Sequence, residues 1–402
     1  MAIVGTGSKV KEYEAKLLIA FILFPSLIVS IVLNWHTASA LITVLGSVVA
    51  LFISPTAYKR LTTPFIGTVL MFIAYLLAYR FDLSTLSSSS LILTITPWLF
   101  ISPYLKEPRL WRIVLMGMII YGIVLAIAHL PAQVIEFYRQ GNVLQTPIHH
   151  GTWSLLIGLP SVWLLWTGYR QRNLFDALIG LLGIIYVHAL GSRIGIVGIW
   201  ITTVFFLWQF IKNKDFFTKA WILLAIWFGG LTMYYTIPTF QMRIRYAFYD
   251  VGQIMNNRNV VDFSDSRRIA SWIAGLNALE RNYFLGSGHH SAKQRVNKLL
   301  MEKFGFSQEH LIVPHNEFLW MVVRAGLIGL ALFTLGLFLF MNSTWNVCTA
   351  SVHLAYLSRM IIDVPFGTQH GILGYIILLT WAMAIHKFFS NGHFQHSNLQ
   401  NQ

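Results

Sequence analysis

The stretch Val313–Gly329, VPHNEFLWMVVRAGLIG, changes from polar to almost wholly apolar within a few residues. His315, Asn316 and Glu317 open it, and Arg324 lies well inside the apolar part. A helix needs about 20 apolar residues to cross the hydrocarbon layer of a bilayer. The pattern therefore predicts a membrane-spanning helix with a polar end. A cation as deep as Arg324 must find a partner inside the protein, for which Glu317 and Asp363 are candidates.

Composition extends this prediction to the whole chain of 402 residues, of which 56% are hydrophobic and 11% are charged. So little charge is typical of a protein with many membrane spans. The lysines near the start precede an apolar run that is too long for a cleaved signal, so residues 17–34 are predicted to form a first span. The single cysteine, Cys348, excludes an intramolecular disulfide framework. We attribute the net charge of +14 to membrane lipids and topology rather than to nucleic acid.

The apolar runs predict an all-α polytopic membrane protein with about twelve transmembrane helices and a cytoplasmic N-terminus. Short cytoplasmic loops should hold most of the Lys and Arg. With this topology the short outside loops contain only Arg80, Arg139 and Arg193, whereas nearly every inside loop is basic. The expected spans are 17–34, 38–54, 64–80, 88–104, 111–130, 150–168, 174–190, 194–211, 219–237, 316–340, 346–364 and 367–386.

One outside connection is much longer than the others and is rich in charge. Within it, apolar positions at helical spacing from Ile269 to Leu279 predict one amphipathic helix, which Gly286 ends. Ser291 and Gln294 form a capping-box pattern that starts a second helix, which stops at Gly305. The loop is thus expected to form a helical cap on the membrane. The predicted domains are residues 1–237 (spans one to nine), 238–314 (the loop), 315–387 (spans ten to twelve) and 388–402 (a disordered cytoplasmic tail).

Three arginines on the outer face are candidates for binding an anion. Arg193 ends the short loop before span eight and lies between Gly191 and Gly195, two glycines that would let a bulky ligand approach the backbone; an interfacial arginine is the alternative. Arg267 and Arg268 lie in the first turn of the first cap helix, where free N–H groups and guanidinium groups can bind an acidic ligand together. Their alternative role is pairing with nearby Asp262 or Asp265.

Histidines are the other polar residues on this face. His315 precedes a helix N-terminus, where the dipole disfavours the imidazolium ion and leaves the ring able to accept a proton. The alternative is an interfacial or capping histidine. The pairs His289/His290 and His149/His150 lack further ligands at suitable spacing, so zinc is not expected. The acidic stretch DFSD also lacks the ligands for a divalent metal, and the sequence predicts no metal site and no cofactor.

These residues together resemble the O-antigen ligase family. The late motif of that family runs His, then Asn, Ser or Gln, then nine residues, then Gly-x-x-Gly followed by Thr. Here His315 and Asn316 are followed by Gly326 and Gly329, with Leu330 where Thr is usual. The arginine before a span, the long outside loop with RRIASW, the stretch FLGSGHH and the twelve-span layout are similar to the family as well.

The resemblance implies a GT-C-like, inverting, metal-independent glycosyltransferase of the bacterial inner membrane with its site facing the periplasm. Its donor would be a glycan on undecaprenyl diphosphate and its acceptor lipid A–core. The implied roles are His315 as base and Arg193, Arg267 and Arg268 as diphosphate ligands. Asn316, Glu317, Arg324, His289 and His290 would support the site. An O-antigen polymerase, a protein O-oligosaccharyltransferase and a lipid-linked glycan transporter stay open as alternatives. The transporter should show broken helices or paired halves around a midplane site, and the sequence shows no such repeat.

Overall fold

The computed structural model describes residues 26–29, 36–53, 62–81, 89–99, 108–129, 145–212, 215–236, 238–255, 264–279 and 283–399. Within these residues the protein is all-helical, which confirms the predicted class. The α-helices are α3 (His36–Ile53), α4 (Thr62–Ala78), α5 (Ile95–Leu99), α6 (Pro108–Ala128), α8 (His150–Gln171), α9 (Leu174–Leu190), α10 (Arg193–Ile211), α11 (Phe216–Thr236), α12 (Pro238–Met255), α13 (Ser264–Ala278), α14 (His289–Phe304), α15 (Glu317–Ser343), α16 (Val347–Ile362) and α17 (Gln369–Leu399). Short 3-10 helices are η4 (Ser89–Thr94), η7 (Gln308–His310) and η8 (Pro365–Gly367).

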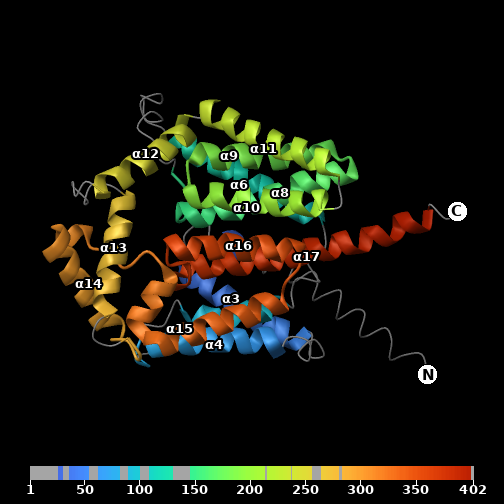
Figure 1. Cartoon of the computed structure of the whole chain (residues 1–402). Coiled ribbons are helices and arrows are strands. Elements are labelled where there is room, and N and C mark those ends of the chain that lie inside the picture. Colours follow the sequence, from blue (N-terminus) through green and yellow to red (C-terminus); the bar gives the residue numbers. More distant parts are fainter. Residues whose placement is uncertain are drawn as a thin grey trace, which may run out of the picture.

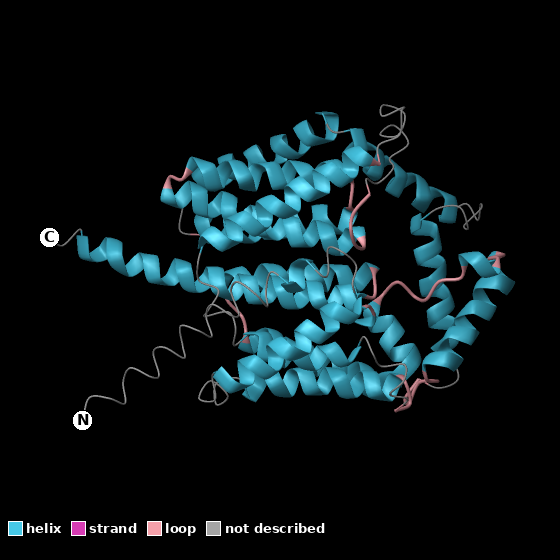
Figure 2. Ribbon diagram, turned by 180° about the vertical axis from the view of Figure 1, so that it is seen from behind, coloured by secondary structure: helices cyan, strands magenta, loops and turns pink. Residues whose placement is uncertain are grey.

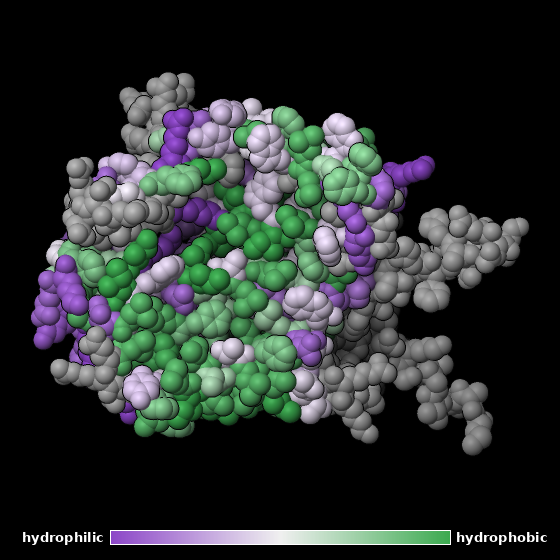
Figure 3. All heavy atoms as spheres, in the orientation of Figure 1, coloured by the Kyte–Doolittle hydropathy of each residue, from purple (hydrophilic) through white to green (hydrophobic). Residues whose placement is uncertain are grey.

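The long apolar helices form one bundle, and α12, α13 and α14 lie across one end of it (Figure 1). The far end of α17 projects from the opposite end of the bundle (Figures 1 and 2). The bundle surface is mainly hydrophobic, whereas hydrophilic atoms gather on the cap and in a hollow between the cap and the bundle (Figure 3). This distribution fits a bundle in lipid with a polar cap in water.

Three of the described helices are long and apolar enough to cross a membrane, namely 111–128, 216–236 and 317–343. Shorter apolar helices coincide with six further predicted spans. These helices support a membrane protein, whereas the number twelve stays a prediction. Most of the first expected span, 17–34, and all of the basic N-terminal segment before it lie outside the described residues.

The expectations for the cap and the tail need three corrections. The second cap helix begins at His289 with Gly288 as its N-cap, so Ser291 lies inside the helix and forms no capping box. Its end at Gly305, in a left-handed conformation, agrees with the prediction. The first cap helix ends at Ala278, earlier than Gly286. The tail was expected to be disordered, but α17 continues through it to Leu399.

Helix α15 packs against α4 along a close interface. A Cβ atom on Gly67 would lie 2.6 Å from the backbone oxygen of Gly336, so the two helices approach with no side chain between them. Small residues at such crossings let helices pack closely where the hydrophobic effect provides no driving force. The contact fixes α15, which carries the polar stretch around His315, against the bundle.

Helix α15 is broken at Gly326, which has φ 70° and ψ −171°. The loop 283–288 enters the break from the cap side. Gly288 N–H donates to the Arg324 carbonyl at 2.8 Å, and Leu327 N–H donates to the Tyr283 carbonyl at 2.8 Å. The backbone groups released by the break are thus satisfied by this loop. The glycine motif after His315 therefore marks the attachment of the cap to a membrane helix.

Gly326→Ala is expected to destabilise the fold by about 1–3 kcal/mol or more, because only glycine tolerates these dihedral angles. A Cβ atom would also collide with the carbonyl of Phe284. Resistance to unfolding by sodium dodecyl sulfate measures the effect. Gly117→Ala is the matched control, because Gly117 lies within α6 and a Cβ there meets no atom within 4 Å. Equal stability of the two variants would show that the break at Gly326 does not need glycine.

Candidate active site

His315 lies between the cap and the bundle, and its backbone is held by α13. The Trp272 indole N–H donates to the His315 carbonyl at 2.9 Å, and the His315 N–H donates to the Ser271 hydroxyl at 3.2 Å. Since α13 also carries Arg267 and Arg268 near its start, these bonds place the two arginines on the element that positions the histidine. The structure thus brings together three of the residues that the sequence selected.

The ring of His315 has a defined tautomer. Its Nδ1 lies 2.9 Å from the carbonyl oxygen of Val313. A carbonyl oxygen can only accept, so Nδ1 carries the hydrogen and Nε2 is left as the proton acceptor. Burial and the positive charge of Arg268 lower the pKa of His315, although Asp363 acts in the opposite direction. The ring is therefore neutral at pH 7 and able to act as a base.

Arg267 is held against the loop that leads to His315. Its Nη2 donates to the carbonyl of His310 at 3.2 Å. Its Nε is buried and has no hydrogen-bond partner among the described residues. A buried guanidinium N–H without an acceptor costs free energy unless a ligand supplies one. The expected partners Asp262 and Asp265 cannot be compared, since their side chains lie outside the described part of the chain.

Asn316 and Glu317 fasten the site to the turn after α16. The Asn316 side chain caps α15 through the Leu319 N–H at 2.9 Å and donates to the Ile361 carbonyl at 3.0 Å. Glu317 accepts from the Phe366 N–H at 2.9 Å. Asp363 lies between these two attachment points in the chain. It is therefore held in the neighbourhood of His315, as its effect on the pKa of His315 requires.

Glu317 and Arg324 form a buried pair, so Glu317 is the one of the two candidate partners that Arg324 binds. Glu317 is 0% exposed and Arg324 is 1% exposed, with 3.8 Å between Oε1 and Nη2. The Tyr75 hydroxyl donates to the same Oε1 at 2.5 Å. The guanidinium carbon of Arg324 lies 5.0 Å from the Trp320 ring centre and 5.1 Å from that of Tyr75. Arg324 is thus enclosed by protein, behind the site rather than at its surface.

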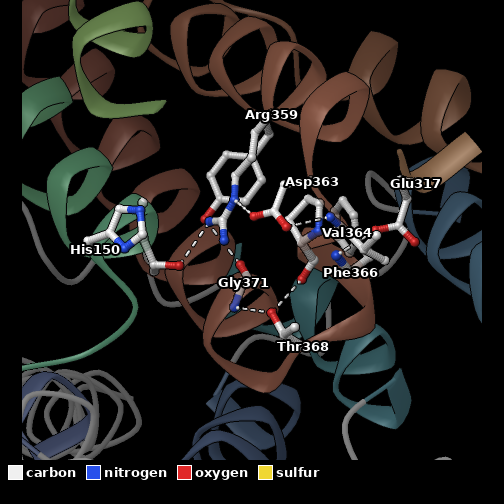
Figure 4. Close-up of polar contacts among 12 residues, drawn as sticks. His150, Glu317, Arg359, Asp363, Val364, Phe366, Thr368 and Gly371 are labelled. Atoms are coloured by element: carbon white, nitrogen blue, oxygen red, sulfur yellow. Dashed lines mark hydrogen bonds and ion pairs between the residues drawn. The ribbon is translucent and has the colours of Figure 1, made fainter. Parts of the chain in front are cut away.

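Asp363, the other expected partner of Arg324, pairs with Arg359 instead. The distance from Arg359 Nε to Asp363 Oδ2 is 3.1 Å, and Arg359 Nη1 donates to the Thr152 hydroxyl of α8 at 2.9 Å. Burial raises the pKa of Asp363, but Arg359 and the Val364 N–H outweigh burial and hold it below its usual value. Figure 4 shows Arg359 and Asp363 between His150 of α8 and Glu317 of α15.

Arg359 and His149 are the site residues that sequence reasoning missed. An arginine within an apolar run is itself a signal of a functional site, and Arg359 carries that signal in the span before Asp363. The sequence suggested for His149 and His150 only a zinc site, which lacked further ligands. Burial, followed by the charge of Arg359, lowers the pKa of His149 to about 4. Both residues border the turn at Asp363.

Arg193 begins α10 beside the start of α8. Its N-cap residue, Ser192, is buried, lies 2.8 Å from the Ser154 hydroxyl and donates to the His150 carbonyl at 3.5 Å. The flanking glycines do not serve ligand approach as expected. Gly191 is the left-handed C-cap of α9, and a Cβ on Gly195 would collide with Ser154. They pack helices so that Arg193 lies at the same end of the bundle as His149.

His289 and His290, the other pair of histidines, lie in different surroundings, one partly buried and the other exposed. His289 stacks on Tyr79 with 4.7 Å between ring centres and lies edge-on to Trp320 at 5.8 Å. Burial, followed by the charge of Arg324, lowers the pKa of His289 to about 4. Its contacts are therefore with Tyr79 and Trp320, two of the rings that surround Arg324, whereas His290 is exposed. The described residues contain no group of three His, Cys, Asp or Glu that could hold a metal ion.

Part of the chain matches a known protein family. Residues 178–334 match the family model described as O-antigen ligase. No curated protein matches the chain. The matched region contains Arg193, both cap arginines, His315 and the glycine of the helix break, so it confirms the resemblance found in the sequence. Members of the family are glycosyltransferase-like enzymes of O-antigen pathways, with lipid-linked glycan and lipid acceptor substrates in general. The chain carries, at residues 178–334, an O-antigen ligase family domain.

Proposed function

We propose that the protein is an O-antigen ligase of the bacterial inner membrane. It transfers a polysaccharide from undecaprenyl diphosphate to a sugar hydroxyl of lipid A–core at the periplasmic face. The observation that carries this proposal is the neutral His315 ring, with Nε2 free to accept a proton, beside the arginines of α13. A base next to anion-binding groups is what glycosyl transfer from a diphosphate requires.

In the proposed reaction, Nε2 of His315 takes the proton of the acceptor hydroxyl as its oxygen attacks the anomeric carbon. The bond between that carbon and the diphosphate oxygen breaks, and its electron pair leaves with undecaprenyl diphosphate. Direct displacement inverts the anomeric centre. The proton stays on His315, where the carboxylate of Asp363 favours the imidazolium ion.

The leaving diphosphate is assigned to Arg193, Arg267 and Arg268. Guanidinium groups stay charged and bind phosphate oxygens in bidentate fashion, so they can stabilise the leaving charge without a metal. The buried Nε of Arg267, which has no acceptor in the described part of the chain, supports this role. Asn316 and Glu317 hold the turn that carries Asp363, whereas Arg324 and His289 act from behind the site through Glu317.

The metal-independent reaction predicts full activity in excess EDTA, because no step uses a divalent ion. Transfer is measured with purified protein, a defined lipid-linked glycan and lipid A–core, with and without EDTA. Added magnesium chloride serves as the control for chelation. Activity that EDTA removes and that magnesium or manganese restores would contradict the arginine assignment.

The product of the same reconstituted reaction tests the proposed function itself. Glycan on lipid A–core supports a ligase. Growth of the glycan on the polyprenyl carrier would identify an O-antigen polymerase, and glycan on a protein acceptor would identify an oligosaccharyltransferase. Both of those outcomes would overturn the ligase proposal while keeping the transfer chemistry.

A transporter of lipid-linked glycan is the alternative from another class. Broken helices are expected of transporters, and α15 is broken at Gly326. The break in α15, however, is filled by the loop 283–288, whose backbone groups bond to both sides of it. It therefore favours anchoring of the cap over a substrate site. Movement of the donor across vesicles without any transfer to an acceptor would support the transporter.

A further inference from the structure

An apolar groove lies between α8 and α10. It is lined by the halves of these two helices that lie away from the cap in Figure 1. Its volume is about 330 Å³. Two large aromatic residues, Trp166 and Phe206, meet edge to face in its wall with 5.7 Å between ring centres. The full lining consists of Val162, Leu165, Trp166, Tyr169, Thr203, Phe206 and Leu207. Trp166, Tyr169 and Thr203 each carry one polar group, but the surface of the groove is almost wholly apolar, so it should hold an apolar group.

The outer end of the groove is bordered by cations and amphipathic aromatic residues. The guanidinium carbon of Arg170 lies 5.5 Å from the centre of the Trp166 ring. Arg172 follows as the left-handed C-cap of α8 and is exposed, and Tyr169 is 67% exposed. Tryptophan, tyrosine and arginine in this combination are typical of the level of the lipid head groups.

The length of α8 places this end at a membrane surface. Its 22 residues span about 33 Å, close to the thickness of the hydrocarbon layer. Since the His150 end of α8 borders the candidate active site, the Arg170 end lies at the opposite face of the membrane. The groove therefore opens to the leaflet that does not contain the active site.

We propose that this groove binds one anionic phospholipid, with an acyl chain against Leu165 and Phe206 and the phosphate at Arg170. The positive charge beside the groove favours an anionic lipid over a second copy of the chain as the occupant. Two copies meeting at the groove would bring Arg170 and Arg172 toward like charges, whereas an anionic head group is attracted to both. Basic sites between membrane helices at the surface of a leaflet are suited to such lipids.

The test measures lipid binding to the intact detergent-solubilised protein by native mass spectrometry. Phosphatidylglycerol is compared with phosphatidylcholine of the same chains. One tightly bound phosphatidylglycerol is expected, and Arg170→Gln should weaken it roughly five-fold, equivalent to about 1 kcal/mol per charge. Leu165→Trp, which fills the groove, should remove the bound lipid.

Two matched controls separate the site from general effects. Lys298→Gln removes one charge from α14 in the cap, where the side chain is 70% exposed, and should change nothing. Leu178→Trp adds the same bulk on α9, where Leu178 is 48% exposed, and should also leave lipid binding intact. Equal binding of the two lipids by all variants would overturn the proposal. If the wild-type protein forms dimers and Leu165→Trp abolishes them, the proposal is overturned, because the groove then binds a second copy of the chain. Neither result depends on glycan transfer.

Discussion

His315→Ala is expected to lower the rate of glycan transfer about 10²- to 10⁴-fold, the usual contribution of a positioned general base. The Nδ1–H bond to the Val313 carbonyl orients the ring so that Nε2 is the acceptor, and alanine removes that acceptor altogether. The backbone bonds of residue 315 to Ser271 and Trp272 do not involve the ring, so the fold should persist.

The rate is measured with purified variant in the reconstituted reaction, alongside its resistance to unfolding. His310→Ala is the matched control, because His310 lies in the same loop and, among the described residues, its ring bonds only to the nearby Ser307 hydroxyl at 2.6 Å. The backbone carbonyl that accepts from Arg267 is kept in this control. Transfer by His315→Ala at the rate of the control would remove His315 from the mechanism.

Glu317→Ala and Arg324→Ala are each expected to destabilise the protein by about 3–5 kcal/mol, because each leaves the other charge buried without its partner. Both side chains are almost completely inaccessible. Arg324 has no other carboxylate within ion-pair distance among the described residues, and its Nη2 has no hydrogen-bond partner there. Loss of Glu317 also removes the acceptor for Tyr75 and for the Phe366 N–H.

The double variant Glu317→Gln/Arg324→Met separates stability from positioning. It leaves no charge buried, so much of the lost stability should return. Transfer should stay impaired, since the glutamine amide would offer the Phe366 N–H and Tyr75 hydroxyl one acceptor oxygen, where the carboxylate of Glu317 offers two.

Unfolding by sodium dodecyl sulfate measures the stability of all these variants. Lys298→Ala, which breaks an exposed pair with Glu302, is the control and should cost less than about 1 kcal/mol. A Glu317→Ala protein as stable as that control would show that the buried pair is unimportant.

Local patterns in the sequence predicted those features that depend on a few neighbouring residues. Hydropathy predicted an all-helical membrane protein, and the depth of Arg324 in an apolar helix predicted a partner inside the protein, with Glu317 and Asp363 as the candidates. Helical spacing also predicted the two cap helices, with an error at the start of α14. That error arose because Gly288 ends the turn that enters the break in α15, and this constraint is tertiary.

The remaining features depend on contacts between distant segments. Arg359 and Asp363 gain their place in the site from α8 and from Glu317, which the spacing in the chain does not reveal. Gly326 was recognised as part of a sequence motif. Glycine is needed there because the loop 283–288, about 40 residues earlier in the chain, enters the break in α15. Gly195 was expected to admit a ligand because glycine serves helix packing and ligand approach equally well in a sequence. The distances that distinguish these uses come only from the fold.

The pH dependence of kcat/KM for glycan transfer tests most directly whether His315 is the base. A base works in its neutral form, so activity should fall as the pH drops through the lowered pKa of His315. Arg268 lowers that pKa, so Arg268→Gln should move the acidic limb to higher pH. Asp363 raises it, so Asp363→Asn should move the limb to lower pH. Opposite displacements in the two variants are the predicted result, and an acidic limb at the same pH in wild type and both variants would contradict the assignment of His315.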